Sequence, residues 1–164
     1  MKIIPLTQGK EATVDDCDYE YLTQWKWQFH RPGNRRTGYA SRREKAGEKC
    51  RRIYMHCLVL ARSGLMVDGR HVDHVDGNGL NNCRGNLRAS TTSQNHANRP
   101  GNRNNTSGFK GVSWNRGAGK FEAHITVSRH KLHLRYFDDP RDAARAYNEA
   151  ALKFYGEFAC LNSV

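Results

Sequence analysis

The stretch HVDHVDGN (residues 71–78) brings two histidines and two aspartates together within six positions and then enters a turn. Valines flank the polar residues, and DGNG (76–79) is a strong turn signal. A second short run, GNLRAS (85–90), follows, and STTSQNHANR (90–99) offers serine and threonine as N-caps of a polar helix. The pattern predicts a turn, a second short run and a polar helix around one polar cluster.

Asp73 and His74 carry the chemistry of this cluster. A carboxylate is a hard oxygen ligand suited to Mg²⁺ or Mn²⁺, and a histidine can take a proton from water near neutral pH. Hydrolysis of a phosphodiester needs both an activated water and a cation beside the charge that develops on phosphorus. A further group must complete such a site, and the predicted helix carries two candidates, Asn95 and His96.

The charge of the chain indicates a polyanionic partner. Among 164 residues, 27 Lys and Arg oppose 16 Asp and Glu, so the formal net charge is +11 and the pI is near 9.7. Nucleic acid fits this excess better than a membrane, because no segment combines a bulky apolar face with a lysine-rich back. No apolar run reaches the roughly 18 residues of a membrane span, and the start lacks a signal peptide. We therefore expect an intracellular, cytoplasmic protein with no membrane partner.

The five cysteines are scattered, odd in number and form no Cys-x-x-Cys pair. This argues against a cysteine-based zinc site and against a disulfide framework. We expect reduced thiols.

Residues 1–62 look β-rich. YLTQWKWQFH (21–30) alternates with its aromatic residues on one face, and GYASRREKAGEKCRRIYMH (38–56) reads as a hairpin that turns near Ala46-Gly47. YMHCLVLARSG (54–64) is compatible with a helix. The basic residues of this segment either contact DNA or form a solvated hairpin: Lys26, Arg31, Arg35, Arg36, Arg42, Arg43, Arg51 and Arg52.

The pattern changes after RPGNRNNTSG (99–108), whose composition is that of a linker. FKGVSWN (109–115), KFEAHITVS (120–128) and KLHLRYF (131–137) read as three strands. DDPRDAARAYNEAALKFYG (138–156) reads as a helix in which Asp139 is the cap, Pro140 lies in the first turn and Gly156 marks the end. We expect one stripe of this helix to cover the sheet: Ala143, Tyr147, Ala150 and Phe154.

Asp73-His74, Asn86 and Asn95, within VDHVDGNGLNNCRGNLRASTTSQNHANR (72–99), resemble the HNH motif of phage and intron-associated homing endonucleases. The resemblance implies a ββα-metal nuclease in which His74 is the general base and Asp73 ligates a single divalent metal. Asn86 would hold the loop and orient His74. Asn95 would be the second metal ligand; we favour it over His96, whose side chain would point about 100° away on a helix.

Each of these residues also has a purely structural alternative. DGNG (76–79) is a common turn on its own, Asp76 could be only a turn cap, and His71 need have no catalytic role. The four motif residues could also form a structural knot, but a buried knot of this kind needs many partners, whereas a metal and a phosphate satisfy it directly.

From SGFKGVSWN (107–115) to GEFACLN (156–162), the chain resembles the AP2 DNA-binding domain, most distinctively in YFDDPRDAARAYNEAALKFYGEFACLN (136–162). The resemblance implies that a three-stranded sheet enters the major groove while the helix packs behind it. The residues expected to contact DNA are Lys110, Trp114, His124, Thr126, Lys131 and His133. Ser113, Thr126 and His133 stand where plant members use arginine and tryptophan, so sequence preference does not carry over. A merely solvated charged face is the alternative.

These observations predict an α+β chain in four parts, namely a β-rich segment (1–62), the HNH nuclease (63–99), a linker (100–108) and an AP2-like domain (109–164). We expect a DNA endonuclease that uses one divalent metal ion, Mg²⁺ or Mn²⁺, and nicks double-stranded DNA as a monomer. A DNA-binding regulator with a degenerate HNH module is the alternative. RNA is not an expected partner, because A-form RNA closes its major groove to side chains.

Overall fold

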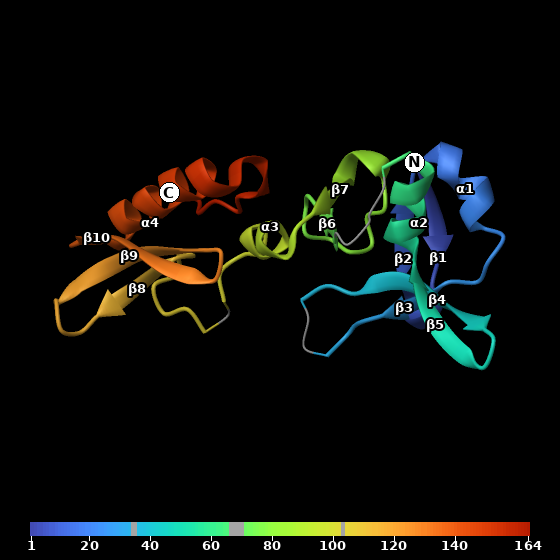
Figure 1. Cartoon of the computed structure of the whole chain (residues 1–164), viewed down its shortest axis with the longest axis horizontal. Helices are drawn as coiled ribbons and strands as arrows, with labels where there is room; N and C mark the ends of the chain where they lie inside the picture. The colour runs from blue at the N-terminus through green and yellow to red at the C-terminus, as the bar shows by residue number, and fades with distance from the viewer. Residues whose placement is uncertain (34–35, 66–70, 103) are drawn as a thin grey trace. The chain divides into compact units, whose positions relative to one another are not determined.

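The computed structural model describes residues 1–33, 36–65, 71–102 and 104–164, and it has an α+β fold. The chain forms two compact units, Met1–Thr91 and Thr92–Val164. The first unit combines small antiparallel sheets with short helices, and the second combines a single sheet with one short and one longer helix (Figure 1). None of the helices in the described parts of the chain is both long and apolar enough to span a bilayer.

The described residues of the first unit form three separate antiparallel sheets and two α-helices. Strand β1 pairs with β2, β4 lies between β3 and β5, and β6 pairs with β7. Its elements are β1 (Lys2–Pro5), η1 (Thr7–Gly9), β2 (Glu11–Val14), α1 (Asp16–Leu22), β3 (Gln28–His30), β4 (Tyr39–Ala46), β5 (Lys49–Tyr54), α2 (Met55–Arg62), β6 (His71–His74), η2 (Arg84–Asn86) and β7 (Leu87–Ser90).

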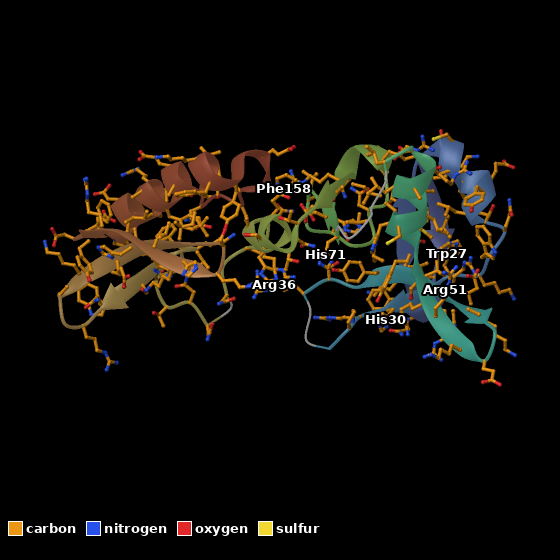
Figure 2. All side chains as sticks on the ribbon, viewed as in Figure 1. Trp27, His30, Arg36, Arg51, His71 and Phe158 are labelled. Atoms are coloured by element: carbon orange, nitrogen blue, oxygen red, sulfur yellow. The ribbon has the colours of Figure 1, made fainter. Side chains whose placement is uncertain are left out.

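One apolar core holds the first unit together. The buried side chains of α2, Met55, Val59 and Leu60, pack with residues of β2, α1 and β7. Trp27 belongs to the same core and donates its indole N–H to the Leu22 carbonyl at 2.8 Å; Figure 2 shows it among the side chains of this unit. Burial of these large apolar side chains is the main contribution to the stability of the first unit.

The expected strand over residues 21–30 is wrong in its first half. Tyr21 and Leu22 end helix α1, and only Gln28–His30 form a strand. The aromatic residues in between still face the core, because Trp25 and Phe29 pack against it. The hairpin over 38–56, with its turn after Ala46, and the helix that follows are confirmed as β4, β5 and α2.

The second unit consists of a short helix and a three-stranded antiparallel sheet covered by a longer helix. Strand β9 is central, between β8 and β10. The elements are α3 (Thr92–Ala97), β8 (Val112–Asn115), β9 (Lys120–Val127), β10 (His130–Phe137), α4 (Pro140–Tyr155) and η3 (Gly156–Phe158). The three predicted strands and the predicted helix are confirmed, although β8 is shorter than expected.

Helix α4 begins and ends where its cap residues predict. The Asp139 side chain accepts a hydrogen bond from the Arg141 N–H at 2.7 Å, and Gly156, with φ of 52°, follows the last turn. The buried stripe differs from the expected one, because Ala144 and Ala151 are buried with Ala143 and Tyr147, whereas Phe154 is exposed. The small side chains let the helix lie close to Val112, Ala123 and Ile125 of the sheet.

The division into two units falls between Thr91 and Thr92. Helix α3 therefore groups with the C-terminal sheet, and residues 100–108 lie inside the second unit. Asn105 and Ser107 hydrogen-bond to the carbonyls of Phe109 and Val112 there. The four-part division expected from the sequence stays a prediction about function.

Candidate active site

The loop between β6 and β7 is built around the Asp76 carboxylate. It accepts hydrogen bonds from the Asn78 N–H at 2.8 Å and from the side-chain amides of Asn81 and Asn86 at 2.8 and 2.9 Å. Burial raises the pKa of Asp76, but these three hydrogen bonds together lower the pKa by more than burial raises it, so the net shift is downward. Asp76 therefore acts as a turn cap.

The same loop is anchored to the N-terminal elements. The Asn82 N–H donates to the Thr13 carbonyl at 2.8 Å, and the Thr13 N–H donates to the Leu80 carbonyl at 2.9 Å. Gly79 is buried against β4, where an added Cβ would come within 2.4 Å of the Gly38 oxygen and 2.6 Å of the Tyr39 ring. Only glycine permits this approach, so the first strands fix the loop.

A buried ion cluster adds a second anchor. Asp18, on α1, is fully buried and pairs with Arg84 at 2.7 Å and with Arg62 at 3.1 Å. Hydrogen bonding from Arg84 holds the pKa of the Asp18 carboxyl below its usual value, against the opposing effect of burial. The cluster ties α1 and the end of α2 to the start of η2.

Asp73 lies in β6, with 4% of its surface exposed, opposite Arg88 of β7. The Arg88 Nε donates to Asp73 Oδ2 at 2.9 Å, and Arg88 Nη2 lies 2.9 Å from the same oxygen. The carboxylate is thus oriented by a guanidinium from the neighbouring strand. Sequence reasoning missed Arg88; the hairpin register that pairs residue 73 with residue 88 would have indicated it.

His74 ends β6 and is 6% exposed. Burial lowers the pKa of its imidazole, and the Asn82 side chain and the charges of Asp76 and Asp73 oppose this shift without reversing it. The ring is therefore neutral near pH 7, and a neutral imidazole can accept a proton. Its low exposure restricts the directions from which a water molecule can approach.

Asn86 was expected to hold the loop and to orient His74. Its side chain holds the loop, since it donates to Asp76 and to the Asn81 carbonyl, and its oxygen accepts the Asp76 N–H at 3.0 Å. The amide beside the His74 ring is that of Asn82. Asn82 was not singled out from the sequence, where it is one of several asparagines around the turn.

Four aromatic or imidazole rings, from Tyr39, Tyr54, His56 and His74, form a cluster that the sequence did not predict. His56 lies in the first turn of α2 with its ring centroid 5.0 Å from that of His74, at an interplanar angle of 89°. Tyr39 lies 5.5 Å from His56 and 5.9 Å from His74. Burial, followed by the neighbouring His74, lowers the pKa of His56 to about 3. We call these four residues the ring cluster.

Asn95 and His96, the two candidate metal ligands from the helix, both lie on α3 in the second unit. Asn95 is half-buried, whereas His96 is exposed and lines a cavity of that unit. Within the described residues, no group of three or more His, Cys, Asp and Glu side chains forms a metal site. His71, on β6, is exposed.

Four of the N-terminal arginines, Arg42, Arg43, Arg51 and Arg52, lie on the hairpin of β4 and β5, whereas Arg35 lies outside the described residues. Glu44 pairs with Arg42 at 2.9 Å and with Arg51 at 2.7 Å, and Arg52 donates to the Ser41 hydroxyl at 3.0 Å. Arg51 is seen at the side of this sheet in Figure 2. Arg43 and Arg51 are exposed, whereas Arg42 and Arg52 are half-buried, and both expectations, a DNA contact and a solvated hairpin, stay predictions.

In the second unit, Thr126, Lys131 and His133 are exposed on the sheet face that lies opposite α4. Lys131 lies opposite Thr126 and His133 lies opposite His124 of β9. The Glu122 carboxylate on the same face lies 3.0 Å from the Lys131 Nζ and 3.4 Å from the His133 Nδ1. Hydrogen bonding from Lys131 is the main cause that lowers the pKa of Glu122. The face therefore carries one acid among its bases.

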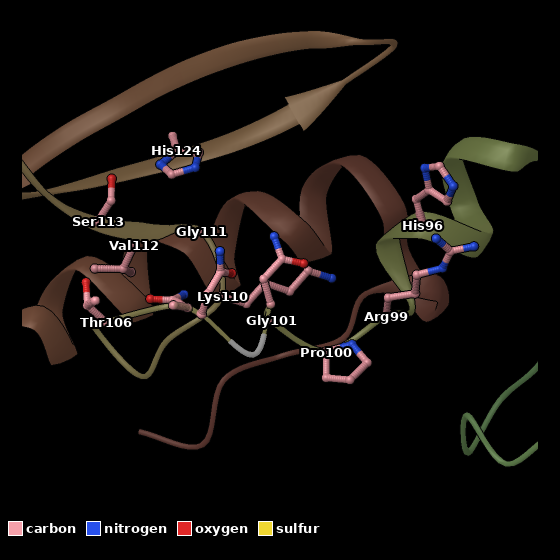
Figure 3. Close-up of a pocket in the computed structure, with 13 residues that line it drawn as sticks. His96, Arg99, Pro100, Gly101, Thr106, Lys110, Gly111, Val112, Ser113 and His124 are labelled. Carbon is pink, nitrogen blue, oxygen red and sulfur yellow. The ribbon is translucent and has the colours of Figure 1, made fainter. Parts of the chain in front are cut away.

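Two other expected DNA contacts, Lys110 and His124, line a cavity of about 420 Å³ (Figure 3). Its wall combines basic, amide and hydroxyl side chains and contains no acid. The Lys110 ammonium donates to the Ala97 carbonyl, and burial lowers its pKa. Burial also lowers the pKa of His124, whose Nδ1 is buried and has no hydrogen-bond partner among the described residues.

Trp114 is placed differently from the other expected DNA contacts. It pairs with Phe121 in the β8–β9 register, and the two rings meet edge to face with centroids 4.9 Å apart. Phe121 packs against the core under α4, so Trp114 lies on the helix side of the sheet. Trp114 therefore does not share a face with Thr126 and Lys131, because side chains on a strand alternate between faces.

Known proteins similar to this chain come from viruses and plants. Over 157 residues, the chain is 30% identical to a protein of Acanthamoeba polyphaga mimivirus named as an uncharacterized HNH endonuclease, and the match covers 96% of the chain and 77% of the relative. Protein 3.8 of Escherichia phage T7 is 31% identical over 99 residues, which are 60% of the chain and 81% of the relative.

The plant proteins match a smaller part. An AP2-like ethylene-responsive transcription factor of Arabidopsis thaliana is 41% identical over 66 residues, which are 40% of the chain but 14% of the factor. Rice APETALA2-like protein 2 is 41% identical over 64 residues, and the chain spans 15% of its length. The chain matches no protein-family model and no solved structure.

Proposed function

Because the chain belongs to the HNH endonucleases, we propose that it is a metal-dependent DNA endonuclease in which His74 activates the attacking water. The observation that carries the proposal is the Asp73-His74 pair at the end of β6, where a buried carboxylate adjoins a neutral, buried imidazole. A general base must be unprotonated near the operating pH and within reach of a water. Burial of His74 supplies the first condition.

The residues fit a hard divalent cation in the chemistry of their donors. Asp73 offers a carboxylate and Asn95 an amide oxygen, both of which suit Mg²⁺ or Mn²⁺. The ion would need DNA phosphate and water to complete its coordination. When bound, such an ion stabilises the negative charge on the phosphate under attack. Arg88 orients the Asp73 carboxylate for this role.

The reaction assigned to the chain's own residues is a proton transfer. His74 takes a proton from a water molecule, and the hydroxide attacks phosphorus, so that the bond to the 3′ oxygen breaks and a 5′ phosphate remains on the other fragment. Asn82, His56 and Tyr39 lie beside the His74 ring during this step. One such site in a monomer would cut one strand, and a nick is the product that we propose.

The second unit is proposed to bind double-stranded DNA as an AP2-like domain. The exposed bases of its sheet, Lys131 and His133, and the acid-free cavity beside Lys110 and His124 support this role. The partial similarity to plant AP2-like factors supports it independently. A DNA-binding domain tethered to a nuclease raises the local concentration of the nuclease near its target site.

The test is conversion of supercoiled plasmid to open circle in Mg²⁺, with EDTA as a control. The plasmid should carry the DNA that flanks the protein's own gene. We expect His74→Ala to lower the rate by about 10²- to 10⁴-fold, the usual contribution of a general base. His71→Ala is the matched control, because this histidine lies in the same strand but is exposed.

Direct conversion to linear plasmid would contradict the monomeric nick but keep the chemistry. If the wild type and His74→Ala are equally inert in Mg²⁺ and Mn²⁺ while both shift the same DNA on a gel, the catalytic proposal is wrong. The chain would then be a DNA-binding protein with a degenerate nuclease module.

A further inference from the structure

We propose that His56 is a positioning residue that, together with Tyr39, fixes the plane of the His74 imidazole. This inference rests on the proposed function, in which His74 is the general base. It concerns a residue of α2 that lies 18 positions before His74 in the chain and outside the HNH motif. Its evidence is the geometry of the ring cluster.

The His74 ring needs to be held by its surroundings. Rotation about the last side-chain torsion of a histidine is broad, and a half turn puts a ring carbon where each ring nitrogen was, because Nδ1 exchanges with Cδ2 and Nε2 with Cε1. A general base works only when its accepting nitrogen faces the water. The backbone of β6 fixes the position of the His74 Cα and Cβ atoms but leaves this rotation undetermined.

His56 and Tyr39 restrict that rotation from two sides. The His56 ring meets His74 nearly at a right angle, at 89°, with centroids 5.0 Å apart, and the Tyr39 ring lies 5.9 Å away at 47°. At these separations, turning the imidazole out of its plane would bring its atoms into neighbouring rings. The Asn82 side chain lies beside the same ring and completes the set of neighbours.

His56 is itself held firmly. Its ring stacks on that of Tyr54 with an interplanar angle of 11° and a centroid separation of 5.3 Å. Tyr54 precedes α2, and His56 lies beside Met55, which is fully buried in the core. The clamp on His74 therefore belongs to the folded core of the first unit.

The nitrogens of His56 are not what this inference requires. Its Nδ1 is buried and has no hydrogen-bond partner among the described residues. Burial keeps the ring uncharged over the pH range of a nuclease assay, because its pKa falls to about 3. A ring of similar shape without nitrogens should consequently do the same work, and this makes His56→Phe the informative variant.

The experiment compares His56→Ala, His56→Phe and Val59→Ala in the full chain. Val59 is the matched control, since it is fully buried one turn further along α2 and is not part of the ring cluster. Single-turnover cleavage is measured at saturating DNA in Mg²⁺, DNA affinity is measured by gel shift in EDTA, and unfolding is followed to confirm that each variant is folded.

We expect His56→Ala to slow cleavage about 10- to 100-fold, the scale of a misplaced catalytic group, with its DNA affinity unchanged. His56→Phe should restore the rate to within about threefold of the wild type, because the ring is restored. Val59→Ala should lower stability but cleave at the wild-type rate when folded. A wild-type rate in His56→Ala, an equally slow His56→Phe, or an equally slow Val59→Ala would overturn the inference.

A second readout does not depend on cleavage. Long-range ¹H–¹⁵N spectra report the tautomer and the order of the His74 ring at a pH where it is neutral. One ordered tautomer in the wild type and in His56→Phe, with exchange between two in His56→Ala, is the expected result. If the wild type does not cleave, the proposed function fails, and these spectra still decide whether His56 orients the ring; identical spectra in all variants would refute it.

Discussion

The two units place their functional polar groups in opposite surroundings. In the first unit, Asp73, His74 and His56 are each at least nine-tenths buried and are held by neighbouring side chains. In the second, Lys131 and His133 stand on an open sheet face and share one carboxylate. Chemistry requires the first arrangement, because geometry must be fixed to within fractions of an ångström. Attraction to phosphate requires only charge that DNA can reach.

The comparison has a consequence for mutants. Substitutions around the buried site should change stability and cleavage together, since the same contacts serve both. Substitutions on the open face should change affinity alone.

The largest effect should come from the ion cluster at Asp18. Asp18→Asn leaves Arg84 and Arg62 without their shared carboxylate. Breaking a buried pair costs about 3–5 kcal/mol in the free energy of unfolding, and we expect the lower end of this range because the two guanidinium groups are partly exposed to solvent. Hydrogen exchange measured by mass spectrometry should show the loss of protection in residues 1–91 and none in β8–β10 or α4. An equal loss of protection in both units would contradict the proposed difference between them.

The same variant gives a pH dependence. Because the pKa of Asp18 is lower in the folded protein than its ordinary 3.8, its contribution is complete well above that value, begins to fall as the pH approaches it, and is lost as the pH falls through the folded pKa. The free energy of unfolding of the first unit should therefore drop from about pH 5 downward in the wild type, and less steeply in Asp18→Asn. Urea unfolding at several pH values measures both slopes, and parallel slopes would contradict the assignment.

A smaller effect is expected at Gly79. In Gly79→Ala the new methyl group would overlap the Gly38 oxygen, so the loop must shift, at a cost of about 1–3 kcal/mol for overpacking. We expect cleavage to fall more than this loss of stability explains, because His74 and the loop share the same support. Gly85→Ala is a matched control, since nothing lies within 4 Å of its added Cβ; equal cleavage in the two variants would refute the coupling.

The smallest effect should be seen on the open face. Lys131→Ala should weaken DNA binding about tenfold or less and lower the slope of log affinity against log salt by about one, as the loss of one phosphate contact does. Stability and single-turnover cleavage at saturating DNA should not change. Trp114→Ala is the contrasting variant, because its ring lies on the helix side and its loss should leave affinity unaltered. A larger loss of affinity in Trp114→Ala would reverse the assignment of faces.

Elements with local signals could be predicted from the sequence. Asp139, Pro140 and Gly156 mark the ends of α4, and alternation of Phe121, Ala123 and Ile125 marks β9. Helix α1 was missed because the alternating aromatic residues after it dominated the pattern. In the structure, its Asp15 accepts the Arg84 N–H at 2.7 Å instead of capping α1 with its side chain.

The site was predictable only where its residues adjoin in the chain. Asp73 and His74 stand out together, but Arg88 reaches Asp73 through strand register, and His56 reaches His74 through the packing of α2. Such contacts depend on tertiary structure, which local sequence patterns do not reveal. The role of Asn82 could not be predicted, because other asparagines lie close to it in the sequence and Asn82 is distinguished by its complete burial.

The attachment of α3 bears on how the protein can be dissected by truncation. The Ala97 carbonyl at the end of α3 accepts hydrogen bonds from the Lys110 ammonium and the Cys160 N–H. A chain shortened after residue 108 would keep Asn95 but lose both of those donors. A loss of cleavage in such a fragment would thus combine the loss of the proposed DNA contacts with a displacement of Asn95, the proposed metal ligand. Point substitutions on the sheet face separate DNA binding from cleavage more cleanly.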